Sequence, residues 1–250
     1  MKANKLASYF FIITLVLHSI PSLYSQETKK LSKDEVILAW DFHGVLVNQE
    51  PWLMIKKAFS ILWKSNNKWE LISLITQAGS EAYSLNKACS SAEDLLIKLI
   101  AKYPVLKKYD QELMELVNLQ TPNQGAIDSL IEMKNKGFQN YLASNIGKRS
   151  LAIMQSKYPK IFEQFKGSFI PEDNDKDIAK PCVEYYIGLR KYLIKQNPNN
   201  SQKPILFIDD QIDNIKGAES AKVNIESIHF KNADQLKQEF NKYLNLNTTL

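Results

Sequence analysis

Side chains that could do chemistry stand at four points along this chain: Asp41 with His43, Ser144 with Asn145, Lys180 with Pro181, and Asp209 with Asp210. Apolar runs of strand length precede Asp41, Ser144 and Asp209, so each of these residues is predicted to follow a buried strand. The carboxyl ends of parallel strands meet at one edge of a sheet, which is where open α/β sheets bind their ligands. We therefore expect these side chains to meet in one site.

The residue types at this edge favour phosphoryl chemistry. The adjacent carboxylates Asp209 and Asp210 repel each other, and a divalent cation such as Mg²⁺, which prefers oxygen ligands, relieves that repulsion. The Ser144 hydroxyl, with neighbouring backbone N–H groups, can bind one phosphoryl oxygen. Lys180 precedes a proline that favours the first turn of a helix, so its ammonium can reach inward from a helix start. The alternative is structural, because aspartates also close strands as turn or cap residues.

Apolar periodicity predicts alternating strands and helices over most of the chain. The strands are expected at residues 35–41, 138–143, 167–170, 204–208 and 224–228. The helices are expected at residues 126–136, 147–156, 182–195, 212–221 and 233–243, with Gly137 as the residue that ends the first of them. Such alternation implies a doubly wound α/β fold with a mainly parallel sheet and right-handed crossovers.

An all-helical stretch interrupts this alternation directly after the first strand. Apolar residues recur at helical spacing from about residue 50 to residue 120, and Ser91 with an acid three residues later indicates a helix start. We therefore divide the chain into an α/β core, residues 26–46 and 121–250, and a helical cap, residues 47–120.

The four motifs, in this order, resemble those of the haloacid dehalogenase (HAD) superfamily of hydrolases: Asp41-Phe-His-Gly-Val-Leu, Ser144-Asn145, Lys180-Pro-x-x-x-Tyr185 and Asp209-Asp210-x-x-x-Asn214. The resemblance covers residues 36–229 and implies a HAD-like core with a helical cap. It implies that Asp41 is a nucleophile that forms an aspartyl-phosphate. Ser144 and Asn145 would bind substrate, and Lys180 would neutralise the acids and contact the phosphoryl group. It also implies that Asp41, the backbone carbonyl of His43 and Asp210 bind Mg²⁺. Asp209 would contribute to the same site, either directly or through another ligand.

His43 departs from the pattern of the phosphatases that the chain resembles, which carry a second aspartate at this position. That aspartate protonates the leaving oxygen and then activates water, and an imidazole is also a competent acid and base near neutral pH. We predict a Mg²⁺-dependent phosphatase acting on a small phosphorylated metabolite. Two alternatives stay open: a binding or regulatory protein that has lost turnover through His43, and a dehalogenase-type hydrolase that uses Asp41 on carbon.

The N-terminus resembles a secretory signal peptide, residues 1–25. Lys2 and Lys5 form a basic start, residues 9–20 are mostly apolar, and Pro21 precedes a polar stretch. The apolar part is short for a membrane span, which needs about 20 residues. We predict cleavage near Ser25 and export to a periplasm or the exterior, with no stable membrane association afterwards. An uncleaved membrane anchor is the alternative.

Charge distribution argues against a nucleic-acid partner. The formal net charge is +5, and without residues 1–25 it falls to +3, from 30 basic and 27 acidic residues. The basic residues are dispersed, with no dense run interleaved with aromatic residues. We therefore predict no nucleic-acid binding.

Two cysteines occur in the chain, Cys89 and Cys182. They could pair in an oxidising compartment, but the sequence does not place their Cα atoms within disulfide range, and we expect two separate thiols. A zinc site is not expected, because only His43 and His229 remain once the signal peptide is removed.

Overall fold

The structure of the protein is a computed structural model that describes residues 29–64, 72–73, 89–174 and 177–246. The predicted signal peptide and much of the predicted helical stretch between residues 65 and 88 lie outside the described residues. Within the described ranges, no helix is both long enough and apolar enough to cross a lipid bilayer.

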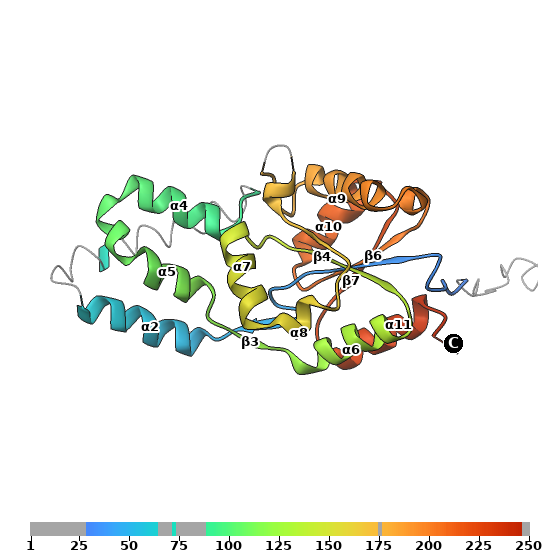
Figure 1. The fold of residues 1–250 in the computed structure, drawn as a ribbon, viewed down its shortest axis with the longest axis horizontal. Helices are drawn as coiled ribbons and strands as arrows, with labels where there is room; N and C mark the ends of the chain where they lie inside the picture. Colours follow the sequence, from blue (N-terminus) through green and yellow to red (C-terminus); the bar gives the residue numbers. More distant parts are fainter. Residues whose placement is uncertain (1–28, 65–71, 74–88, 175–176, 247–250) are drawn as a thin grey trace, which may run out of the picture.

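A five-stranded parallel sheet forms the centre of the core, with its strands in the order β5-β4-β1-β6-β7 (Figure 1). The strands are β1 (Ile37–Trp40), β4 (Gln139–Ala143), β5 (Ser168–Phe169), β6 (Ile205–Asp209) and β7 (Ile225–His229). Trp40 pairs with Leu142 on one side and with Ile208 on the other, so β4, β1 and β6 end level with one another. The predicted α/β fold is confirmed.

Helices cover both faces of this sheet (Figure 1). One face packs against α6 (Gln124–Asn135), α7 (Lys148–Lys157), α8 (Pro159–Phe162) and α11 (Ala233–Tyr243). The other face packs against α9 (Val183–Gln196) and α10 (Ile212–Ser220). Because side chains alternate along a strand, Leu38 and Trp40 lie in the first layer, and Ile37 and Ala39 lie in the second. β1 is therefore buried on both faces, which explains its uninterrupted apolar sequence.

The strand and helix boundaries follow the sequence pattern within one or two residues. Gly137 follows α6 with a positive φ of +84°, as predicted for the residue that ends this helix. Short 3-10 turns, η2 (Pro171–Asp173) and η3 (Pro198–Ser201), lie in the loops before α9 and β6.

A set of helices lies beyond one end of the sheet (Figure 1). In the sequence these helices come between two short strands that pair with each other in antiparallel fashion. The strands are β2 (Val47–Gln49) and β3 (Gln120–Pro122). Between them lie α2 (Pro51–Lys64), α4 (Ala92–Lys102), η1 (Pro104–Tyr109) and α5 (Asp110–Val117). We call these four elements the helical segment. Ser91 begins α4 as predicted, since its Oγ accepts a hydrogen bond of 3.0 Å from the Asp94 backbone N–H.

The two ends of the described core lie side by side. Leu31 and Leu244 form a parallel β-bridge. The Leu31 N–H donates to the Tyr243 carbonyl at 2.9 Å, and the Asn245 N–H donates to the Leu31 carbonyl at 2.8 Å. These bonds hold the chain that enters β1 against the chain that leaves α11.

Cys89 and Cys182 form a disulfide, with their Cα atoms 5.8 Å apart, so the expectation of two separate thiols is wrong. Cys89 lies just before α4 in the helical segment, and Cys182 lies just before α9 in the core. The cysteines are 93 residues apart in the sequence, and only the packing of the helical segment against the core brings them together. No local sequence pattern could reveal that packing.

Candidate active site

Three carboxylates meet at the carboxyl ends of β1 and β6. Asp41 follows β1, and its backbone N–H donates to the Ile208 carbonyl of β6 at 2.9 Å, which places Asp41 beside Asp209. One oxygen from each of Asp41, Asp209 and Asp210 lies within 4.8 Å of the other two. The level ends of the adjacent strands therefore produce the acid cluster that the sequence predicts.

Lys180 lies inside this cluster. Its Nζ atom is 2.6 Å from Asp209 Oδ2 and 3.0 Å from Asp41 Oδ1, and it donates to the Ala143 carbonyl at 3.1 Å. Burial lowers the pKa of the Lys180 ammonium, but the charges of Asp209 and Asp41 outweigh it and raise the pKa overall. Lys180 thus remains a cation that offsets part of the carboxylate charge.

Asn145 holds the backbone of Lys180. The Lys180 N–H donates to Asn145 Oδ1 at 2.8 Å, and Asn145 Nδ2 donates to the Lys180 carbonyl at 2.9 Å. The resemblance to the HAD superfamily implies that Asn145 binds substrate, whereas both ends of its amide bond the Lys180 backbone here. We therefore infer that Asn145 orients the lysine.

Pro181 does not lie in the first turn of a helix, contrary to the prediction. Helix α9 begins at Val183, and Cys182 before it is in an extended conformation. Lys180 and Pro181 lie in a turn, the two bonds from Asn145 hold the Lys180 backbone there, and a Cβ on Gly217 would lie 2.1 Å from the Pro181 carbonyl oxygen. The lysine therefore reaches the site from a loop that is clamped between β4 and α10.

Asp209 is fully buried, and both of its oxygens already accept hydrogen bonds. Oδ1 accepts from the Gln211 N–H at 2.8 Å and from Asn214 Nδ2 at 2.9 Å. Oδ2 accepts from Lys180 and from Asn214 Nδ2 at 3.1 Å. Burial raises the pKa of Asp209 to about 6, although Lys180 opposes this change. Because both oxygens of Asp209 are already engaged, we expect Asp209 to act on a bound cation through another ligand and not by direct contact.

Asn214 closes the fourth sequence motif, which assigns no role to its side chain. It lies in the first turn of α10, and its amide bridges the two oxygens of Asp209. Tyr186 supports this arrangement by donating its hydroxyl to the Asn214 carbonyl at 2.6 Å. The useful signal was the five-residue spacing from Asp209, which places the side chain back over the strand end.

Two buried oxygens in the site have no partner among the described residues: Asp210 Oδ1 and Ser144 Oγ. A buried oxygen without a partner is costly unless a ligand or water satisfies it. Ser144 is fully buried at the end of β4, where Tyr185 donates its hydroxyl to the Ser144 carbonyl at 3.3 Å. The open oxygens of Asp210 and Ser144 are thus available to a cation and to an anionic group.

The donor set fits a divalent cation. The three carboxylates and the single ammonium of Lys180 carry a net charge of −2 when all are ionised. Burial raises the pKa of Asp210, and the charge of Asp209 raises it further. Oxygen ligands with uncompensated negative charge are the ligands that Mg²⁺ prefers. Asp41, Asp210 and the predicted His43 carbonyl are the groups that would hold the ion.

Asp41 presents one occupied and one open oxygen. Its side chain is buried, with 3% of the residue exposed. Oδ1 accepts from the Phe42 N–H at 2.7 Å and lies 3.0 Å from Lys180 Nζ. Oδ2 accepts no hydrogen bond from any described residue, which leaves it as the candidate nucleophilic oxygen.

His43 is half-buried and lies edge-on to the Phe42 ring, with ring centroids 5.4 Å apart. Burial and, secondarily, the charge of Lys180 lower the pKa of His43 to about 4. The imidazole is therefore neutral near pH 7. In that form it can accept a proton but is a poor proton donor.

Gly44 allows the Asp41 loop to approach Asp210 closely. Gly44 has a φ of +79°, and a Cβ at this position would lie 2.3 Å from the Cγ of Asp210. We expect Gly44→Ala to displace the Asp210 carboxylate and weaken Mg²⁺ binding by about tenfold or more, measured by titration calorimetry. Gly137→Ala is the matched control, because Gly137 also has a positive φ but faces only the flexible Lys33 side chain. Equal Mg²⁺ affinities in the two variants would contradict this prediction.

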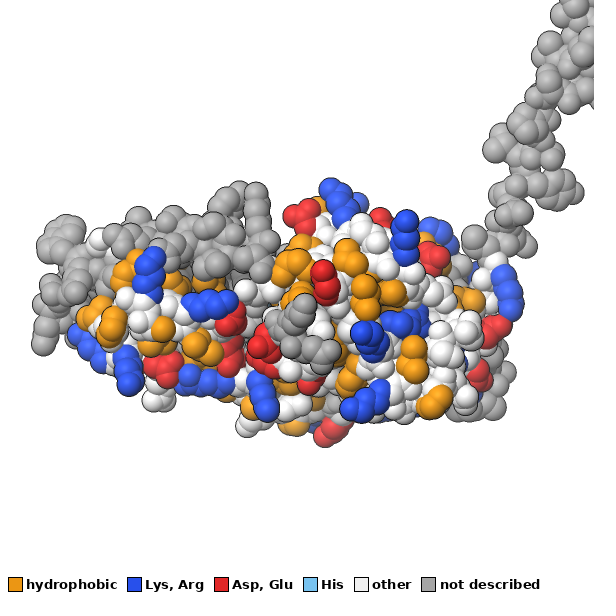
Figure 2. All heavy atoms as spheres, turned by 90° about the horizontal axis from the view of Figure 1, so that it is seen from above, with side chains coloured by type: hydrophobic (Ala, Val, Ile, Leu, Met, Phe, Trp, Pro, Cys, Tyr) orange, Lys and Arg blue, Asp and Glu red, His pale blue; other side chains and the backbone are white. Residues whose placement is uncertain are grey.

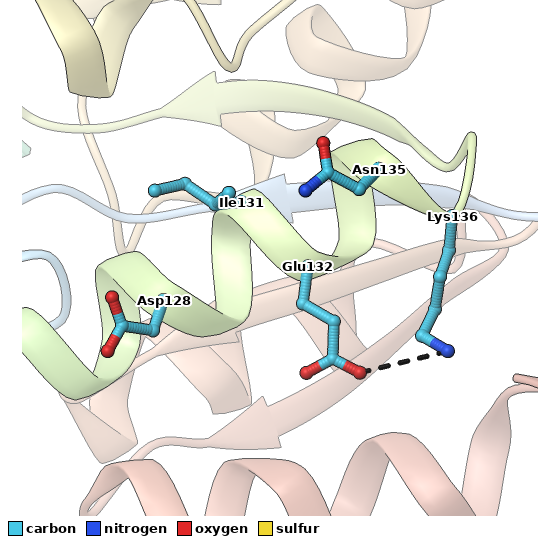
Figure 3. A pocket seen from close by; sticks show the side chains of 5 residues that line it. All are labelled: Asp128, Ile131, Glu132, Asn135 and Lys136. Carbon is cyan, nitrogen blue, oxygen red and sulfur yellow. Dashed lines mark ion pairs between the residues drawn. The ribbon is translucent and has the colours of Figure 1, made fainter.

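Among the described residues, no second group of three His, Cys, Asp or Glu side chains lies close enough together to share a metal ion. A hollow of about 520 Å³ lies on the outer side of α6, lined by Asp128, Ile131, Glu132, Asn135 and Lys136 (Figure 3). Its Glu132 and Lys136 side chains pair with each other at 3.8 Å. On the face shown in Figure 2, the described Lys and Arg side chains are scattered rather than gathered in one patch. The acid cluster at the strand ends remains the strongest candidate site.

The fold is similar to the folds of solved HAD-family proteins. No protein-family model matches the sequence, and no curated protein matches it. The structure is similar to that of YfnB, a HAD-hydrolase from Bacillus subtilis bound to magnesium, with a TM-score of 0.59 and 18% identity. That match covers 83% of this chain and 99% of that one.

Two further solved structures resemble this one. A HAD family enzyme from Bacteroides thetaiotaomicron has a TM-score of 0.55 at 16% identity, over 82% of this chain and 97% of that one. L-2-haloacid dehalogenase from Xanthobacter autotrophicus, with chloropropionic acid covalently bound, has a TM-score of 0.51 at 12% identity, over 83% and 82% of the two chains. The chain thus has the HAD-like fold that its motifs predict.

Proposed function

We propose that this protein is a hydrolase of small phosphate monoesters that depends on a divalent cation. The observation that most supports this proposal is that Asp41, Asp209 and Asp210 converge around the buried ammonium of Lys180. The unpartnered Asp210 Oδ1 in this site could bind the cation, and the unpartnered Ser144 Oγ could bind a phosphoryl oxygen. The magnesium bound to the similar YfnB structure supports the choice of Mg²⁺.

The residues present can carry out two successive displacements. Asp41 Oδ2 attacks phosphorus, a P–O bond to Asp41 forms, and the P–O bond to the ester oxygen breaks; the leaving alkoxide takes up a proton and departs as the alcohol. Water then attacks the same phosphorus and gives up a proton, and the P–O bond to Asp41 breaks, which releases phosphate and restores the carboxylate. Lys180 holds Asp41 in place by its contact with Oδ1, and the Ser144 hydroxyl can donate to a phosphoryl oxygen. A bound divalent cation would supply charge stabilisation for the phosphoryl oxygens.

The helical segment is proposed to act as a cap over this site. Asp41, Ser144 and Lys180 are each 3% exposed or less in the present arrangement. A closed site excludes water while the aspartyl-phosphate forms, which favours transfer to Asp41. A buried site also favours a small metabolite as substrate.

Two other functions compete with this proposal. The neutral His43 imidazole favours a binding or regulatory protein with weak turnover, because it is a poor donor to a leaving oxygen. The similarity to a dehalogenase with a covalently bound substrate allows attack of Asp41 on carbon. The acid pair Asp209 and Asp210 favours phosphoryl chemistry, since repelling carboxylates suit a metal site.

The deciding experiment is hydrolysis of an aryl phosphate by the purified protein, with Mg²⁺ and with a chelator. We expect turnover that requires Mg²⁺ and saturates with it. Heat of binding for Mg²⁺ without hydrolysis of aryl, alkyl or acyl phosphates would favour the binding protein. Release of halide from a 2-haloacid, unaffected by chelator, would favour the dehalogenase.

Replacing His43 tests its part in the reaction. We expect His43→Asp to raise kcat for an alkyl phosphate by about 10²-fold, because a carboxyl group there could protonate the poor leaving oxygen. An aryl phosphate, whose leaving oxygen needs little protonation, should gain much less. His43→Asn is the matched control, being similar in size to aspartate but unable to ionise. Slower turnover of both esters by His43→Asp would instead make the imidazole the working acid and base.

Export to a periplasm or the exterior is proposed for this protein. The sequence of residues 1–25 supports it, and so does the Cys89–Cys182 disulfide, since disulfides persist in oxidising compartments. Retention by an uncleaved anchor remains the alternative. Comparing the N-terminal residue of the exported protein with Met1 distinguishes the two.

A further inference from the structure

The helical segment is attached to the core at a second place besides the β2–β3 connection. The disulfide joins Cys89, before α4, to Cys182, before α9. Alongside it, the Ala179 N–H donates to the Cys89 carbonyl at 2.8 Å. In Figure 1 the start of α4 lies near α9, while β3 lies at the opposite end of α7. The two attachments are therefore apart, and a swing of the segment about β2–β3 is blocked by the disulfide.

Glu93 forms the non-covalent part of this attachment. It lies in the first turn of α4, only 6% exposed, four residues after Cys89. Its carboxylate accepts from the Ser150 N–H at 2.8 Å and from the Arg149 N–H at 3.2 Å, both in the first turn of α7. A carboxylate at a helix N-terminus satisfies free amides and is favoured by the helix dipole. Glu93 of the helical segment thus caps a helix of the core.

The surroundings of Glu93 are shaped to receive it. A Cβ on Gly147, which precedes α7, would lie 2.4 Å from Glu93 Oε2. Next to this contact, Arg149 NH1 lies 3.1 Å from both carboxylate oxygens of Asp110, at the start of α5. α7 therefore binds the helical segment through its backbone and through a side chain.

Both core elements in this attachment lead into the candidate site. α7 begins four residues after Ser144, and Cys182 follows Lys180 by two residues. A displacement of Cys182 or of the α7 start would pass directly to the loops that carry Ser144 and Lys180. The position of the helical segment and the geometry of the site are thus mechanically coupled.

We propose that the Cys89–Cys182 disulfide is a redox-sensitive tether that keeps Glu93 on the N-terminus of α7 and so holds the helical segment closed over the acid cluster. Reduction by a dithiol breaks the S–S bond. Two electrons and two protons pass to Cys89 and Cys182, giving two thiols, while the dithiol becomes a disulfide. The segment is then held by β2–β3 and the polar contacts alone, and Glu93 leaves α7 more often. Glu93 is a positioning residue in this arrangement.

Hydrogen exchange of the backbone amides tests this tether, and the test does not require the protein to turn over a substrate. The link to catalysis rests on the proposed function, but exchange of the α7 amides does not. We expect reduction of the native protein to speed exchange in a peptide covering residues 148–152 by about tenfold or more, because two hydrogen bonds to a carboxylate are lost on opening. Exchange in β1, β4 and β6 should stay unchanged, and reoxidation should restore protection.

Three variants separate the tether from the carboxylate. Cys89→Ser should reproduce the reduced state and should no longer respond to a dithiol. Glu93→Gln should speed exchange at residues 148–152 with the disulfide intact, and Glu93→Asp should restore part of the protection. Asp94→Asn is the matched control, since Asp94 is the next residue of the same helix turn and, among the described residues, its carboxylate pairs with Lys98 on the surface.

The possible results decide the proposal clearly. Faster exchange confined to residues 148–152 and to the start of α4 supports it, whether or not the protein hydrolyses phosphate esters. If thiol counting shows complete reduction and the exchange rates are unchanged, the proposal is overturned. Faster exchange throughout the core strands would also overturn it, because the disulfide would then stabilise the whole fold instead of holding one segment. If the protein proves active, reduction should change KM more than kcat, since access to the site is what alters.

Discussion

Asp41→Asn is expected to abolish turnover of phosphate esters, with a loss of at least about 10⁴-fold in kcat, because an amide nitrogen cannot form the phosphoryl bond. The fold should be unaffected. Oδ1 of the new side chain can still accept from the Phe42 N–H and from Lys180, so the amide nitrogen takes the place of the open Oδ2. Initial rates with an aryl phosphate and Mg²⁺ measure the loss, and thermal unfolding measures stability.

A matched variant shows whether the loss is specific to the site. Asp234→Asn makes the same chemical change in the exposed first turn of α11 and should leave turnover as it is. Turnover by Asp41→Asn within about tenfold of the native protein would exclude Asp41 as nucleophile, since loss of a nucleophile costs far more. A nucleophile other than Asp41 would then have to attack phosphorus.

Lys180→Met is expected to destabilise the protein more than any exposed lysine substitution. The ammonium lies within 3.0 Å of both Asp41 and Asp209, and all three side chains are buried. Removing one partner of a buried ion pair leaves uncompensated charge, which typically costs about 3–5 kcal/mol. Urea unfolding with a chelator present measures the difference, and Lys216→Met on the exposed side of α10 is the control.

The loss of stability caused by Lys180→Met should be smaller at low pH than at high pH. Burial raises the pKa of Asp209 to about 6 in the folded protein, and Lys180 lowers it, so the variant should have a higher value still. A carboxyl group with a raised folded pKa stabilises the fold below its unfolded pKa and loses that contribution as the pH rises through the folded value. The variant should therefore be closer to the native protein at pH 5 than at pH 8. An equal deficit at both pH values would contradict this account.

The site was largely predictable because it depends on how strands end. Each apolar run in the sequence fixes a strand of the sheet, and parallel neighbours must end at the same edge. Asp41, Ser144 and Asp209 were identified from that rule alone. The register that pairs Trp40 with both Leu142 and Ile208 then makes their meeting unavoidable.

The contacts that orient these groups were less predictable. An amide such as Asn145 or Asn214 can bind a substrate, a backbone group or a carboxylate, and its residue type does not distinguish between them. The partners of Glu93 lie 56 and 57 residues away in another helix. Such pairings depend on how the helical segment packs on the core, which apolar periodicity does not specify.

The β-bridge between Leu31 and Leu244 has a consequence for chain connectivity. Because the backbone near residue 31 is hydrogen-bonded to the backbone near residue 244, a short linker could close the described chain into a ring without strain. The linear order of β1 and α11 is then incidental to the architecture. The sheet needs β1 between β4 and β6, but it does not need β1 to come first, so circular permutation is compatible with this fold.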